Sequence, residues 1–119
     1  MTKEDRMERA RQLHKSGLNC CQAVLLAFAD KLPVDETAAK MVSAPFGRGL
    51  AGMREVCGCV SGMAMACGFS GKEQLTKSAI DDFRNINGDV VCARLLQKGK
   101  KPCNELIADA AGILSDYLE

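Results

Sequence analysis

The segment Asn19-Cys20-Cys21-Gln22-Ala23-Val24-Leu25-Leu26-Ala27-Phe28-Ala29 (residues 19–29) decides the fold, because a helix formed by it is apolar on nearly every face. Such a helix is buried on all sides, so we expect it at the centre of the molecule. Asn19 is a favourable N-cap and Pro33 cannot continue a helix, which predicts a helix from residue 20 to about residue 31. Its apolar run, residues 23–29, is far shorter than the ~20 residues that span a membrane.

The rest of the chain also has helical patterns. Apolar residues recur at three- and four-residue spacing, as at Leu75, Ala79 and Phe83, and only Gly88-Asp89-Val90-Val91 resembles a strand. Stop and start signals, among them Gly17 and a Ser70/Glu73 capping box, divide the chain. We expect helices over residues 3–15, 20–31, 36–43, 55–67, 71–87, 90–98 and from 102 onward. The sequence thus predicts one all-α domain over residues 1–119, a compact bundle of about six or seven short helices.

The composition is that of a soluble globular protein, with 47% hydrophobic and 26% charged residues. Sixteen basic against fifteen acidic residues give a net charge of +1, which argues against a protein built to hold nucleic acid or an anionic membrane. Residues 1–6 mix acids with bases and show no apolar export signal. We therefore expect a cytoplasmic protein with neither nucleic acid nor a membrane as its partner.

Seven cysteines are the unusual feature of the composition. An odd count without an export signal speaks against a secreted disulfide scaffold, since cytosolic thiols are kept reduced. Four of them lie in or beside the first turn of an expected helix: Cys20, Cys57, Cys92 and Cys103. Unpaired N–H groups and the helix dipole at that position favour the thiolate, which is the form that attacks disulfides or binds metal. Nearby bases act in the same direction, namely Arg54, Arg94, Lys100 and Lys101.

The surroundings of these four cysteines resemble a known family. The chain carries Asn19-Cys20, Cys57-Gly58-Cys59-Val60-Ser61-Gly62, Cys92-Ala93-Arg94-Leu95-Leu96 and Pro102-Cys103. Together they are similar to the C-GCAxxG-C-C redox-active protein family, which is named for its cysteines and not for a known reaction. The resemblance covers nearly the whole chain. It implies a small helical protein with a redox role, whose signature cysteines correspond here to Cys20, Cys57, Cys92 and Cys103.

The chain departs from the family pattern at two places. Cys59 stands where the family's CGAxxG pattern has alanine, and Cys92-Ala93-Arg94 replaces the more usual Cys-Arg-Glu. The first departure adds a thiol to the expected site. Along an α-helix of 100° per residue, however, Cys59 points about 200° away from Cys57, so the two would not face one site if that turn is helical.

The remaining signals have simpler interpretations. Cys21 and Cys67 share helix faces with apolar residues, which indicates core packing. Gly47-Arg48-Gly49-Leu50-Ala51-Gly52 satisfies G-x-G-x-x-G, but no strand precedes it, so we expect a tight loop and no nucleotide. Gly58, Gly62 and Ala66 form a smooth face for a neighbouring helix, most naturally the apolar one. His14, the only histidine, lies on a polar helix and is expected in solvent.

No Cys-x-x-Cys occurs, which counts against zinc ribbons, a thioredoxin dithiol and compact ferredoxin motifs. A site assembled from several helix starts remains open. Thiolates of Cys20, Cys57, Cys92 and Cys103 could hold an iron–sulfur cluster or zinc, or two thiols could pair reversibly as a disulfide.

We favour an electron-transfer site with an iron–sulfur cluster, for which the redox candidates are Cys20, Cys57, Cys59, Cys92 and Cys103. The alternatives are a metal-free thiol/disulfide oxidoreductase, in which Cys59 serves as resolving nucleophile, and a non-enzymatic zinc-stabilised helical interaction module. A redox role implies a redox partner protein. The apolar helix is also compatible with a homodimer.

Overall fold

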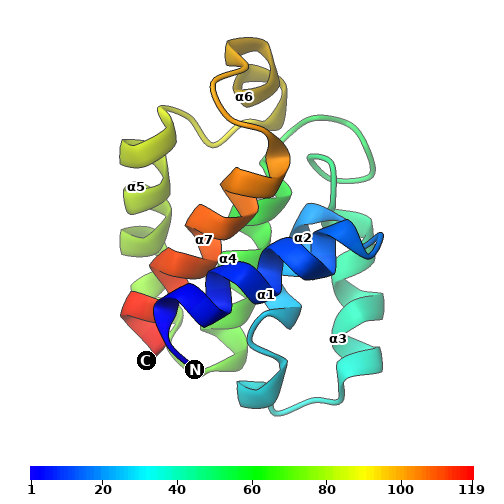
Figure 1. Cartoon of the computed structure of the whole chain (residues 1–119), viewed down its shortest axis with the longest axis vertical. Helices are drawn as coiled ribbons and strands as arrows, with labels where there is room; N and C mark the ends of the chain where they lie inside the picture. Colours follow the sequence, from blue (N-terminus) through cyan, green and yellow to red (C-terminus); the bar gives the residue numbers. More distant parts are fainter.

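The apolar segment that follows Asn19 forms the central helix α2 (Cys20–Leu26). In the computed structural model, which describes residues 1–119, the chain forms six further α-helices (Figure 1). They are α1 (Lys3–Lys15), α3 (Glu36–Ser43), α4 (Gly58–Phe69), α5 (Thr76–Asn87), α6 (Cys92–Lys98) and α7 (Cys103–Leu118). Short 3₁₀ turns occupy Ala29–Lys31, Ala44–Phe46 and Glu73–Leu75, and a single isolated bridge joins Val56 to Val91. The prediction of an all-α bundle is confirmed. None of the helices is both long and apolar enough to span a bilayer.

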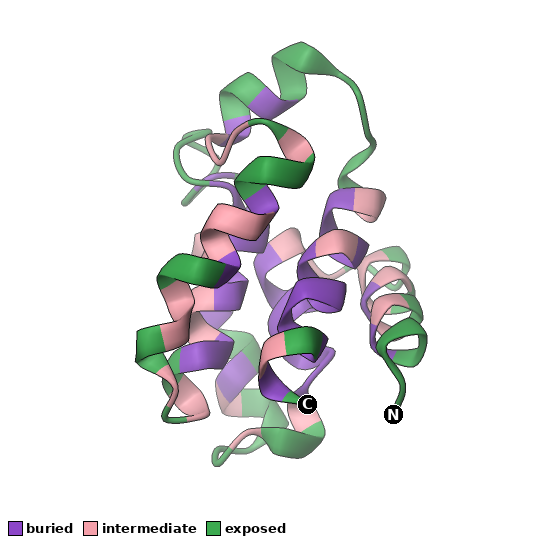
Figure 2. Ribbon diagram, turned by 90° about the vertical axis from the view of Figure 1, so that its left-hand side faces the viewer, coloured by how far each residue is buried: buried purple, intermediate pink, exposed green.

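The core is built around α2. Every residue from Cys21 to Phe28 is buried, and α2 packs against α4, α1, α3 and α7 (Figure 2). Its contact with α4 is especially close. A Cβ added to Gly62 would lie 3.0 Å from both the Cys21 carbonyl oxygen and the Cβ of Val24. The small-residue face of α4 is therefore the surface on which α2 lies, as the spacing of Gly58, Gly62 and Ala66 predicts.

Several helix boundaries differ from the sequence prediction. The apolar helix ends at Leu26 and continues only as a 3₁₀ turn. The fourth helix begins at Gly58 and not at Glu55, because Cys57 is extended and its N–H is donated to the carbonyl oxygen of Val90. The capping box predicted for Ser70 and Glu73 does not form, and α5 begins at Thr76 after a 3₁₀ turn.

The first helix is less solvated than its polar sequence predicts, because α1 lies along α7 and buries Arg6. The Arg6 side chain is only 1% exposed. Its guanidinium pairs with Asp30 and Glu119, donates to the carbonyl oxygen of Ala27 at 2.9 Å, and lies 4.7 Å from the centre of the Phe28 ring. One buried cation thus links α1, the end of α2 and the last residue of the chain.

We expect Arg6→Ala to lower the free energy of unfolding by about 2–3 kcal/mol, because it leaves a buried carbonyl without its donor and separates three segments. Urea denaturation followed by circular dichroism measures the change. The matched control is Arg84→Ala, which removes an exposed pair with Asp81 on α5 and should cost less than about 0.5 kcal/mol. Equal losses in the two variants would contradict the structural role of Arg6.

Candidate functional site

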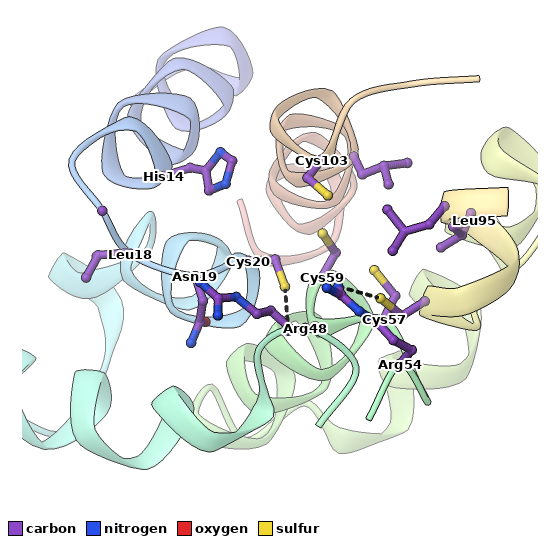
Figure 3. A pocket seen from close by; sticks show the side chains of 15 residues that line it. His14, Leu18, Asn19, Cys20, Arg48, Arg54, Cys57, Cys59, Leu95 and Cys103 are labelled. Atoms are coloured by element: carbon purple, nitrogen blue, oxygen red, sulfur yellow. Dashed lines mark hydrogen bonds between the residues drawn. The ribbon is translucent and has the colours of Figure 1, made fainter. Parts of the chain in front are cut away.

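A pocket of about 370 Å³ opens where α2, α4, α6 and α7 begin, beside the loop of residues 47–57 (Figure 3). Five of the seven cysteines line it: Cys20, Cys57, Cys59, Cys92 and Cys103. All seven thiols are free. The rest of the wall is formed by His14, Leu18, Asn19, Arg48, Arg54 and the leucines of α6 and α7, among others. The structure thus brings the four helix-start cysteines to one pocket, and Cys59 with them.

Helix starts position these thiols. Cys20, Cys92 and Cys103 are the first residues of α2, α6 and α7. The start of α2 is fixed by a reciprocal cap, in which the Asn19 side chain accepts from the Gln22 N–H and the Gln22 side chain accepts from the Asn19 N–H, each at 3.0 Å. The other end of the Asn19 amide donates to the Ala44 carbonyl oxygen at 2.8 Å. The beginning of α2 is therefore locked to the segment that leads into the loop.

Cys59 was expected to face away from Cys57 only if the turn between them is helical. That condition is not met, because Cys57 is the N-cap of α4 with φ −54° and ψ 133°. Because the chain turns at Cys57, its side chain and that of Cys59 both reach the pocket. No motif in the sequence specifies this cap conformation, so the orientation of Cys59 could not be predicted from the sequence.

The sulfur of Cys20 lies directly against Gly58. A Cβ added to Gly58 would fall 2.2 Å from the Cys20 Sγ, so only glycine leaves room for this sulfur. The N–H of Arg48 points to the same Sγ at 3.5 Å (Figure 3). The pKa of Cys20 is lowered to about 6, chiefly by hydrogen bonding with the Cys59 thiol and further by the backbone N–H groups of Arg48 and Cys21, against the opposing effect of burial. Cys20 is therefore largely a thiolate at neutral pH.

The pKa values of Cys57 and Cys59 are shifted in opposite directions. Hydrogen bonding with the Cys59 thiol, together with the N–H groups of Cys59 and Val60, lowers the pKa of Cys57 despite its burial. Cys59 is fully buried, and its pKa is raised well above the usual thiol value. The causes are hydrogen bonding of its thiol with Cys20 and Cys57, and burial, which disfavours its charged form. The three sulfurs thus form a cluster in which a protonated thiol accompanies two sulfurs that favour the thiolate.

The glycine-rich segment forms the tight loop that the sequence predicts. Four of its non-glycine residues have left-handed φ values, at Arg48 (56°), Leu50 (70°), Ala51 (52°) and Arg54 (60°). Gly49 also has positive φ, and a Cβ there would lie 2.4 Å from the Arg54 Cα. Backbone hydrogen bonds hold this costly conformation, including Glu55 N–H to Gly49 O at 2.8 Å.

This loop delivers two arginines to the pocket. The Arg48 backbone contacts Cys20, and the Arg54 Nη1 lies 3.6 Å from the Cys92 Sγ. The loop is also tied to the start of α6, where the Cys92 N–H donates to the Glu55 carbonyl oxygen at 2.6 Å and the Ala93 N–H donates to that of Arg54 at 3.1 Å. Strained backbone that is held in this way is typical of functional sites.

The cysteine surroundings match a family model over residues 18–117, which includes all seven cysteines; its description is "Putative redox-active protein (C_GCAxxG_C_C)". The chain belongs to the C_GCAxxG_C_C family. Neither the curated proteins nor the solved structures that were compared with it gave a significant match.

Two cysteines of this C_GCAxxG_C_C protein lie outside the pocket. Cys21 is buried with its Sγ 3.8 Å from the Sδ of Met65, and its pKa is raised to about 12 by burial and by the charges of Cys20 and Cys57. Cys67 is buried in the core, and burial raises its pKa as well. Both positions agree with the packing role that their helix faces indicate.

His14 lines the pocket, although its polar helix predicts a position in solvent. Its ring Nδ1 lies 3.0 Å from the Asn104 Nδ2 on α7. Arg48 was also missed as a site residue, because its loop was interpreted only through its glycines. The position of both residues in the pocket depends on residues distant in sequence. For His14 the reason is that α1 reaches the pocket by packing on α7 and α2.

We expect the folded protein to react with iodoacetamide fastest at Cys20, with a half-maximal rate near pH 6, since its thiolate form predominates above its pKa. Peptide mass spectrometry at successive pH values measures each cysteine. Cys103, exposed at the pocket mouth and with a raised pKa, is the internal comparison and should react only at higher pH. Cys59→Ala should move the Cys20 profile upward; an unchanged profile would contradict the assigned cause.

Proposed function

We propose that this C_GCAxxG_C_C protein is a thiol–disulfide redox protein in which Cys20 is the nucleophile and Cys59 the resolving thiol. The observation that carries the proposal is the position of the Cys20 sulfur, which lies against Gly58, the residue that separates Cys57 from Cys59 in the sequence. A thiolate at neutral pH beside a protonated thiol is the arrangement that thiol–disulfide exchange requires.

The first step is attack of the Cys20 thiolate on one sulfur of a partner disulfide, RS–SR. A Cys20–S–SR bond forms while the S–S bond of the partner breaks, and RS⁻ leaves. The loss of negative charge at Cys20 removes one of the two hydrogen-bond partners of the Cys59 thiol, which lowers its pKa, and Cys59 gives up its proton to the departing RS⁻. The Cys59 thiolate then attacks the Cys20 sulfur, which forms the Cys20–Cys59 disulfide and releases the second RS⁻. Two electrons pass from the two protein thiols to the partner disulfide, which is reduced to two thiols.

The surrounding residues support these steps. The Arg48 N–H stabilises the Cys20 thiolate, and the guanidinium of Arg54 offers positive charge beside Cys92. The pocket is open to solvent on the side of Cys103, which gives a disulfide access to Cys20. The partner is a redox protein or a small disulfide, and run in this direction the reaction is that of a disulfide reductant.

The role of Cys59 can be tested on anaerobically reduced protein with 2-hydroxyethyl disulfide as oxidant. The unaltered chain should form an internal Cys20–Cys59 disulfide, detected by peptide mapping. Cys59→Ala should instead stop at a mixed disulfide on Cys20, because the resolving sulfur is gone. Cys67→Ala is the matched control, since it removes a buried cysteine away from the pocket and should behave as the unaltered chain. An internal disulfide formed at an unaltered rate in Cys59→Ala, or an unmodified Cys20, would overturn the proposal.

The second candidate is the iron–sulfur electron carrier favoured by the sequence. What supports it is that Cys20, Cys57, Cys92 and Cys103 line one pocket with backbone N–H groups and Arg54, a soft and electropositive setting of the kind that iron or zinc thiolate sites use. No group of three or more His, Cys, Asp or Glu side chains is arranged to hold a single metal ion. We derive no step through a cluster.

Metal content separates the two candidates. Iron and zinc per chain should be measured on protein purified without oxygen from iron-replete cells. The thiol–disulfide proposal expects folded protein with neither metal in stoichiometric amount. About two or four irons per chain, lost on replacing the four signature cysteines and kept in Cys67→Ala, would establish the cluster instead. About one zinc per chain would favour a structural module.

A further inference from the structure

The pocket has basic side chains but no carboxylate. Arg48, Arg54 and His14 line it, and no aspartate or glutamate does. Neither of these two guanidinium groups is paired with a carboxylate, whereas Arg6, Arg11, Arg84 and Arg94 elsewhere on the molecule all are. The Arg54 guanidinium is hydrogen-bonded only to the Cys92 sulfur, and the Arg48 guanidinium has no hydrogen-bond partner in the protein. Arg9 also has no carboxylate partner, but its Nε donates to the Leu26 carbonyl oxygen at 3.3 Å. Arg48 and Arg54 are therefore the arginines that line the thiol pocket without a carboxylate partner.

The loop backbone fixes the positions of Arg48 and Arg54. Arg48 and Arg54 both have left-handed φ values, which non-glycine residues adopt only at a cost in free energy. The N–H of Arg54 is donated to the carbonyl oxygen of Arg48 at 3.2 Å, and this bond ties the two residues together. The two side chains thus start from adjacent points beside the thiols.

The remaining wall indicates the size of the ligand. Leu18, Leu95 and Leu106 supply apolar surface beside the sulfurs, and the volume of about 370 Å³ is at the small end of the range for small-molecule sites. A compound with a short apolar body and a negatively charged end matches both the leucines and the arginines. Guanidinium groups bind carboxylates through paired N–H donors, which makes a carboxylate the best-suited anion.

We propose that the pocket selects a small carboxylate-bearing disulfide, whose carboxylates bind Arg48 and Arg54 while its sulfur lies at Cys20. This inference rests on the proposed thiol–disulfide function and names its substrate class. The arginines act as specificity-determining residues. They hold the anionic end of the disulfide, and Cys20 performs the attack described above.

Three small disulfides of different charge test the selection: 3,3′-dithiodipropionate (anionic), 2-hydroxyethyl disulfide (neutral) and cystamine (cationic). The measured quantity is the ratio of the anionic to the neutral rate constant for oxidation of the reduced chain. In Arg48→Gln/Arg54→Gln this ratio should fall by about fivefold, and the cationic-to-neutral ratio should rise. Because both rates share the same Cys20 thiolate, a change in its pKa cancels in the ratio. Arg84→Gln, which removes an exposed arginine of α5, should leave both ratios unchanged.

Binding can be measured without any exchange of thiols. Suberate, a dicarboxylate close in length to dithiodipropionate but without sulfur, should slow the alkylation of Cys20 by neutral iodoacetamide in the unaltered chain. The double arginine variant should lose this protection, and raised salt should weaken it. Equal rate ratios in the variant and the unaltered chain, or equal suberate protection, would overturn the anionic selection. Suberate protection with no reaction toward any disulfide would overturn the thiol–disulfide function and leave an anion site beside the thiols.

Discussion

The close contact between the starts of α2 and α4 is the constraint on which the site depends. The Cys20 sulfur occupies the place where a side chain on residue 58 would be, and the Gly62 Cα faces the α2 backbone one turn later. Any larger residue at either position would separate the two helices, and Cys20 would then leave the neighbourhood of Cys57 and Cys59. The same small-residue face that allows the core to close therefore also assembles the thiols. Packing and chemistry are consequences of one helix contact.

The charge balance of the pocket follows from this geometry. Two sulfurs that favour the thiolate lie near each other, and like charges so close would ordinarily raise each other's pKa. Hydrogen bonding with the Cys59 thiol, together with backbone N–H groups at the beginning of α4 and in the strained loop, offsets that repulsion. The loop must hold residues in left-handed conformations to do so, and its hydrogen bonds to the start of α6 retain it. Strain in the loop is thus linked to the stabilisation of negative charge at the sulfurs.

Sequence patterns predicted the parts of this structure that depend on local rules. The central apolar helix, its Asn19 cap, the small-residue face and the helix-start cysteines all follow from spacing and capping preferences within a few residues. The side of α4 on which Cys59 lies could not be predicted in this way, because it depends on an extended Cys57 whose N–H bonds to Val90, a residue far along the chain. Arg6 was missed for the same reason. Its burial requires Asp30 and Glu119, which are distant in sequence and meet only when α1 lies on α7.

Cys59 is the pocket thiol that is additional to the four helix-start cysteines, and its protonation explains what it adds. An alanine at position 59 would leave Cys20 and Cys57 with backbone donors alone, and it would remove the largest single cause of the low pKa of each. A buried thiol instead supplies a hydrogen bond while it is protonated and a nucleophile once its proton has left. Cys59 does not have to fill both roles at once, because its hydrogen bond to Cys20 is needed only while Cys20 is charged. The bond is lost when Cys20 becomes bonded to another sulfur, which is the moment at which a second nucleophile is required. In the proposed thiol–disulfide exchange, one added sulfur atom therefore couples activation of the attacking thiolate to resolution of the intermediate that it forms.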